Sequence, residues 1–107
     1  MRVIYVAGPY TGKTINDTFE NIIRARQHAY RLWNQGWAVI CPHANSAFMD
    51  GEDVEATREM FIQGDLEVLK RCDAIYMLPG WSTSRGACLE LKRAKEWGLK
   101  VIYGDEP

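Results

Sequence analysis

Short apolar runs alternate with longer segments of helical periodicity along this chain. Four apolar runs predict strands buried in a sheet: Val3–Ala7, Trp37–Cys41, Ala74–Leu78 and Lys100–Tyr103. Between them, apolar residues recur at the spacing of a helix face, which predicts helices that end at Asn34, run from Glu55 to Arg71, and run from Ser84 to Trp97. The alternation predicts an α/β fold: a three-layer parallel sheet of about four strands, flavodoxin-like or Rossmann-like, with helices on both faces and right-handed crossovers.

Residues near the helix ends indicate where the first helix begins and stops. Asn16 or Thr18 can cap its N-terminus, and Gly36 follows its last turn as a C′ glycine does. In the middle of this helix, His28 is expected to be exposed. In the second helix, Gly64 costs about 1 kcal/mol relative to alanine, so a break or kink there stays an open alternative.

Length and charge narrow the class of protein. The 107 residues predict one domain that spans 1–107. The net charge of -1 gives no basic excess for a nucleic-acid backbone, so no nucleic-acid partner is expected. No apolar run approaches the roughly 20 residues that span a bilayer, and the N-terminal run is too short for a signal peptide, so no membrane partner is expected.

Cysteine and histidine residues predict neither a disulfide framework nor a metal site. Cys41, Cys72 and Cys88 are odd in number and have no paired spacing, so we interpret them as reduced thiols of a cytoplasmic protein. The two histidines have no partner cluster of the kind that holds a metal.

The loop after the first predicted strand, GPYTGKT, is one residue shorter than a Walker A loop. It has three residues between its glycines where the phosphate-binding loop has four, which disfavours an ATPase or a kinase. A glycine-containing loop before a helix can still bind an anion, so Gly8, Thr11, Gly12 and Lys13 are candidate phosphate-binding residues. A solvated loop with an exposed lysine is the alternative.

The segment 65–94 carries the strongest functional signal. It joins a helix end, a buried strand, a Gly/Ser/Thr turn and a new helix, with Asp65 before the strand and Glu90 after it. Ligands of open α/β sheets bind beyond the carboxyl ends of the strands, so the two carboxylates are expected to meet at one site. The alternatives are that Glu90 is a solvated helix residue and that Asp65 pairs with Lys70 or Arg71.

Three motifs keep their order along the chain. Tyr5 lies in VIYVAGP, Asp65 lies in GDLEVLKRCDAI, and Ser84 opens an S-x-G-x-x-x-E segment that ends at Glu90. With this order and spacing, nearly the whole chain resembles the nucleoside 2-deoxyribosyltransferase superfamily, including the 2′-deoxynucleoside 5′-monophosphate N-glycosidases. It looks closest to small members from phage and bacteria.

The resemblance implies roles for the three residues. Glu90 would be the nucleophile that attacks the anomeric carbon of deoxyribose, Asp65 would protonate the departing base, and Tyr5 would hold the Glu90 carboxylate. These roles suit the chemistry, because a carboxylate captures the oxocarbenium-like centre that forms when an N-glycosidic bond breaks, and an acid protonates the base. The expected activity is N-glycosidic bond cleavage or deoxyribosyl transfer, with no cofactor. Tyr5 as a purely structural core aromatic is the alternative.

Ser84 bears on the choice of substrate. The resemblance implies an aspartate at this position in enzymes that bind a free 5′-hydroxyl, and a serine in those that bind a 5′-phosphate. Ser84 and the Gly86 amide, at a predicted helix N-terminus, favour a phosphate, and Ser84 can also cap the helix. A small-molecule deoxynucleotide is therefore expected rather than a deoxynucleoside. His43 is a candidate for lining the base pocket and Trp81 for stacking on the base, with structural roles as the alternatives.

Two features depart from the family pattern. Lys13 is the one cation of the first loop, where the glycosidases carry an arginine. Family members also commonly complete each site with a residue of a partner subunit, so a homo-oligomer is expected. The rival hypotheses are an inactive nucleotide-binding or sensor module with the same fold, and a structural protein in which Trp81 or Tyr10 fills the pocket.

Overall fold

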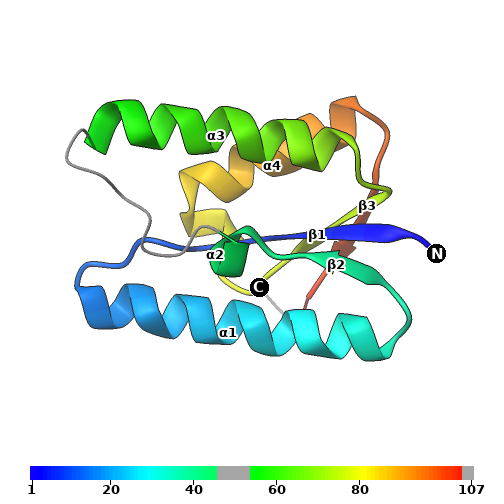
Figure 1. Ribbon diagram of the computed structural model, residues 1–107, viewed down its shortest axis with the longest axis horizontal. Helices are drawn as coiled ribbons and strands as arrows, with labels where there is room; N and C mark the ends of the chain where they lie inside the picture. Colours follow the sequence, from blue (N-terminus) through cyan, green and yellow to red (C-terminus); the bar gives the residue numbers. More distant parts are fainter. Residues whose placement is uncertain (46–53, 105–107) are drawn as a thin grey trace.

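The computed structural model describes residues 1–45 and 54–104, with side chains from residue 58 onward in the second range. The order of elements is β1 (Val3–Ala7), α1 (Ile15–Asn34), β2 (Ala38–Ile40), α2 (Pro42–Asn45), α3 (Val54–Lys70), β3 (Ala74–Met77), the 3₁₀ turn η1 (Trp81–Thr83), α4 (Arg85–Glu96) and β4 (Lys100–Tyr103). All strand pairs are parallel, in the order β2-β1-β3-β4. Helix α1 covers one face of the sheet, while α3 and α4 cover the other (Figure 1). The predicted α/β architecture is confirmed.

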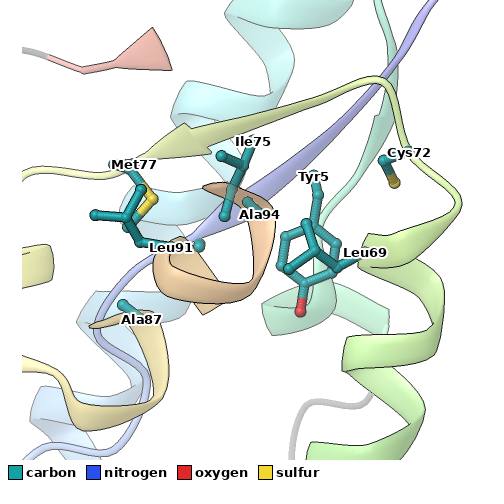
Figure 2. Packing of buried hydrophobic residues seen from close by; sticks show 9 residues of the cluster. Tyr5, Leu69, Cys72, Ile75, Met77, Ala87, Leu91 and Ala94 are labelled. Atoms are coloured by element: carbon teal, nitrogen blue, oxygen red, sulfur yellow. The ribbon is translucent and has the colours of Figure 1, made fainter. Parts of the chain in front are cut away.

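Strand β1 is apolar along its whole length because helices cover both of its faces. Its residues alternate: Ile4 and Val6 pack toward α1, while Tyr5 and Ala7 pack in the cluster formed with α3 and α4. Figure 2 shows Tyr5 beside Leu69 of α3 in this second cluster. The alternation therefore sends the Tyr5 side chain into the layer that also carries the predicted carboxylates.

The N-terminus of α1 differs from the prediction. The cap is Thr14, whose Oγ1 accepts a hydrogen bond from the Asp17 amide at 3.1 Å, and neither Asn16 nor Thr18 caps the helix. Thr18 lies one turn inside α1, and its Oγ1 accepts from the Gly12 amide at 2.8 Å. This bond folds the end of the first loop back onto the helix.

Three further expectations for the helices can be compared with the structure. His28 is 6% exposed rather than solvated, because it lies on the sheet-facing side of α1, where its Nδ1 contacts the Tyr76 hydroxyl of β3 at 2.9 Å. Helix α3 continues through Gly64 without a break. Gly36 has a φ of 96° after α1, which confirms its role as the C′ residue.

In the described ranges, no helix has both the length and the apolar character needed to cross a bilayer.

The centre of the sheet is also where the strand order reverses. The chain moves from β1 outward to β2, then returns to the other side of β1 for β3, so the loops after β1 and β3 separate at the carboxyl edge. These loops approach closely at their base, where a Cβ on Gly8 would lie 2.6 Å from the Leu78 Cβ. A glycine is therefore required at position 8, and the fold opens a cleft just beyond it.

Candidate active site

Tyr5 and Glu90 form the centre of the site. Tyr5 is completely buried in β1, and its hydroxyl donates a hydrogen bond to Oε2 of Glu90 on α4. Glu90 lies one turn into α4, which begins at Arg85 after the cap of Ser84, whose Oγ accepts from the Ala87 amide at 3.1 Å. The interpretation of Glu90 as a solvated helix residue is therefore wrong, since a tyrosine on the central strand β1 holds its carboxylate.

Asp65 lies across from Glu90 on α3, and both side chains line one cleft of about 620 Å³. Neither lysine nor arginine at the end of α3 pairs with Asp65. Arg71 pairs with Glu67 at 2.9 Å, and the Lys70 ammonium lies over the Trp97 ring. The two acids, 25 positions apart in the sequence, are thus brought together as predicted by their flanking of one strand.

Burial raises the pKa of both carboxyl groups. Loss of water is the main cause for Glu90, whose pKa rises to about 7; the charge of Asp65 adds to the rise, and the Tyr5 hydrogen bond opposes it. Burial also raises the pKa of Asp65 to about 6. Near neutral pH, Glu90 is therefore partly protonated, whereas Asp65 is mostly ionised. The pKa of Tyr5 is raised by its own burial and then by Glu90, so Tyr5 stays protonated and remains a donor.

The predicted substrate-binding residues separate into two groups. The first group lines the cleft with the carboxylates: Gly8, Thr11, His43, Ser84 and Gly86. The second group lies outside the cleft lining: Gly12, Lys13 and Trp81. The Gly12 amide is engaged by Thr18, and Lys13 is exposed just before α1. Trp81 packs against the core below α4 and lies 5.8 Å from the Tyr103 ring, measured between centroids.

His43 forms a neutral part of the cleft wall. It is 5% exposed, and its Nε2 donates to the Pro9 carbonyl at 2.8 Å, which ties α2 to the loop after β1. Burial lowers the pKa of His43, so the ring is uncharged. Its buried Nδ1 has no hydrogen-bond partner in the part of the chain that the structure describes. The Tyr10 ring meets the imidazole edge-on at a centroid distance of 5.6 Å.

The cleft between the two carboxylates is open. Tyr10 lines it but leaves the volume given above, and Trp81 does not enter it. The condition that would favour a purely structural protein, a pocket filled by these rings, is therefore not met.

Comparison with known proteins places the chain in a family. A family model described as "Domain of unknown function (DUF4406)" matches residues 2–103. The chain belongs to this family. Among curated protein sequences, none matches the chain.

Solved structures similar to this DUF4406 domain show its fold. A 2-deoxyribosyltransferase from Bacillus psychrosaccharolyticus has a TM-score of 0.70 and 22% identity, over 94% of this chain and 70% of that protein. The CMP N-glycosidase BcmB from Clostridium botulinum has a TM-score of 0.53 and 18% identity, over 95% of this chain and 67% of that protein. The predicted resemblance is confirmed at the level of the fold, which is that of nucleoside deoxyribosyltransferase-like proteins.

Sequence reasoning missed several residues of the DUF4406 domain that line the cleft. They are Arg58, Phe61 and Ile62 of α3, and Thr83 and Arg85 before and at the start of α4. A signal existed for the two arginines. Arg85 occupies the first x of the S-x-G-x-x-x-E segment, and Arg58 precedes Asp65 by seven residues, which is about two helical turns on the same face.

Proposed function

We propose that the protein acts on 2′-deoxynucleoside 5′-monophosphates, cleaving the N-glycosidic bond or transferring the deoxyribosyl group, with Glu90 as nucleophile. The observation that carries the proposal is the hydrogen bond from the buried Tyr5 hydroxyl to Glu90, in a cleft that Asp65 also lines. A strand-anchored donor fixes one oxygen of the carboxylate, which leaves the other oxygen to face a bound sugar.

The first step forms a glycosyl-enzyme. The bond between the anomeric carbon and the base nitrogen breaks, a bond from that carbon to a Glu90 oxygen forms, and Asp65 delivers a proton to the departing base. In the second step, water or an acceptor base attacks the anomeric carbon. The Asp65 carboxylate then takes the proton of the attacking group, and Glu90 leaves as a carboxylate.

The pKa values of the pair fit a reaction that needs one proton. In the free protein, Glu90 is protonated more readily than Asp65, since its pKa is about 7 against about 6. Attack requires the reverse arrangement, with Glu90 ionised and Asp65 protonated. A sugar that develops positive charge beside Glu90 lowers the pKa of Glu90, and this favours transfer of the proton to Asp65.

Two neighbours of the nucleophile support a phosphate-bearing substrate. The Ser84 Oγ accepts the capping bond from Ala87, which leaves its hydroxyl hydrogen as a donor. A Cβ on Gly86 would meet no atom closer than the Ser84 Oγ, at 4.0 Å, so the space beside the start of α4 is open. The free backbone amides and the dipole at a helix N-terminus favour binding of an anion where the space beside them is open.

The test incubates the protein with the common deoxynucleoside 5′-monophosphates and with the matching deoxynucleosides. Chromatography then measures the free base that is released from each. The isosteric Glu90→Gln variant is expected to lose at least about a hundredfold in rate, because it keeps shape but removes the nucleophile. Glu96→Gln is the matched control, since Glu96 lies on the same helix, is exposed and pairs with Arg93. Equal rates for E90Q and the parent protein would refute the assignment.

One result would favour the second hypothesis, an inactive nucleotide-binding or sensor module with this fold. Nucleotide binding measured by calorimetry, with no base released after long incubation, would replace the enzymatic proposal.

A further inference from the structure

The cleft contains two positive charges that the mechanism above does not use. Arg58 on α3 and Arg85 at the start of α4 both line it, and both are exposed. Neither has an ion-pair partner among the residues that the structure describes. The arginines that do form ion pairs, Arg71 and Arg93, lie outside the cleft lining.

The arrangement of α3 and α4 orders the charges within the cleft. The two helices pack on the same face of the sheet and run in the same direction, so both begin at its carboxyl edge (Figure 1). Arg58 precedes Asp65 by seven residues, about 10 Å of helical rise, and Arg85 precedes Glu90 by five, about 7.5 Å. The cations thus lie toward the helix starts, and the carboxylates lie further along both helices.

This order of charges matches an elongated anion rather than a neutral sugar. Asp65 and Glu90 repel a phosphate placed beside them, so a phosphate-bearing substrate must keep that group away from the carboxylates. The rise from Glu90 to Arg85 is of the order of the length of a sugar phosphate. A sugar held at Glu90 can therefore extend its terminal phosphate to the start of α4.

We propose that Arg85 and Arg58 bind the phosphate monoester of the substrate, with the Ser84 hydroxyl and the Gly86 amide as neutral donors beside them. This rests on the proposed function for the position of the sugar. A guanidinium offers a planar pair of donors that matches a phosphate, which a lysine ammonium does not. Lys13, the cation first expected in this role, lies outside the cleft lining. The cation at this site thus comes from the helices rather than from the first loop.

The experiment measures binding without turnover. The parent protein and each variant are titrated with 2-deoxyribose 5-phosphate and with 2-deoxyribose in a calorimeter, and inorganic phosphate is added as a competitor. The phosphorylated sugar is expected to bind the parent protein more tightly. Arg85→Gln should weaken its binding roughly 10- to 100-fold, as expected for loss of a charge-assisted hydrogen bond, and Arg58→Gln should weaken it less.

Matched controls separate the site from general charge effects. Arg71→Gln and Lys13→Gln each remove one exposed positive charge outside the cleft lining, and both should leave binding within about twofold of the parent value. Arg85→Lys should recover only part of the affinity, because it restores the charge without the planar fork. Thermal melting checks that each variant is folded.

The outcomes that overturn the inference differ from those that overturn the proposed function. Unchanged affinity in both arginine variants, equal affinity for the two sugars, or no binding at millimolar concentration would overturn the inference, whatever the base-release assay shows. If the phosphorylated sugar binds through the arginines but no base is ever released, the inference stands and the enzymatic proposal fails.

Discussion

Removing the Tyr5 hydroxyl is the sharpest test of how Glu90, the proposed nucleophile, is ionised. Tyr5 is fully buried in β1 and its ring packs in the core, so Tyr5→Phe keeps the shape and removes one donor. A hydrogen bond to a charged group contributes roughly 1.5–3 kcal/mol, which corresponds to about 1 to 2 pH units in the pKa of the acceptor. Because this bond lowers the pKa of Glu90, its loss should raise that pKa above its present value of about 7.

The assay is the pH dependence of kcat/KM for base release. Attack requires ionised Glu90 and protonated Asp65, so the pH profile should be bell-shaped, and the limb set by the pKa of Glu90 should lie about 1 to 2 pH units higher in the Y5F variant than in the parent protein. At pH 7 the variant should be roughly 5- to 50-fold slower, and its difference from the parent protein should shrink at alkaline pH.

Tyr76→Phe provides the matched control for this substitution. Tyr76 lies on the neighbouring strand β3, and its hydroxyl contacts His28 on the opposite face of the sheet. The Y76F variant should leave the pH profile of base release in place. An unshifted profile in Y5F, or equal shifts in both variants, would show that the Tyr5 bond does not control the ionisation of Glu90.

Four further substitutions test the same geometry through stability and binding. Folding raises the pKa of Glu90 from 4.5 to about 7. The protein is therefore stabilised by the neutral form of Glu90 below about pH 4.5, and this stabilisation is lost as the pH rises through 7. In urea titrations, Glu90→Gln should raise the free energy of unfolding at pH 8 by up to about 3 kcal/mol and change it little at pH 4. Gly86→Ala should fill the open space beside α4 and weaken the binding of 2-deoxyribose 5-phosphate. Gly64→Ala is its control: a Cβ at this helical glycine would meet nothing within 4 Å, so the substitution should raise the free energy of unfolding by about 0.5–1 kcal/mol and leave binding unchanged. Gly8→Ala should cost about 1–3 kcal/mol in urea titrations, because its Cβ would collide with Leu78; a stability equal to the parent would show that the two loops separate freely.

The sheet could be predicted from the sequence because its strands are covered on both faces. Such strands appear as short, continuous apolar runs, and the observed bounds of β1 and β4 match the predicted runs. The cap of α1 could not be chosen in the same way. Thr14, Asn16 and Thr18 are all capping residue types, and the choice is made by the fold of the first loop, where Thr18 is occupied by the Gly12 amide.

The carboxylate pair was predictable, whereas the sequence indicated the positive charges of the cleft much less clearly. Asp65 and Glu90 flank a recognisable strand, so the topology alone brings them to one edge. Arg58 and Arg85 are exposed, as Arg71 is, so their spacing from the carboxylates was a weak signal and the three-dimensional arrangement is what distinguishes them from Arg71. The expectation that His28 is exposed is wrong for a related reason. A polar residue on a helix can be buried when a hydrogen-bonding partner, here Tyr76, lies on the strand that it faces.

The position of Tyr5 in the innermost strand has a consequence for how this protein can diversify. The donor that orients Glu90 belongs to the most constrained layer of the molecule, while Thr11, Arg58 and Arg85 project from its periphery. Substitutions at the periphery cost little folding energy, whereas changes at the strand are felt throughout the packed interior. If the proposed function holds, directed evolution toward new leaving groups or acceptors should therefore accumulate changes around the rim of the cleft and retain the Tyr5–Glu90 pair.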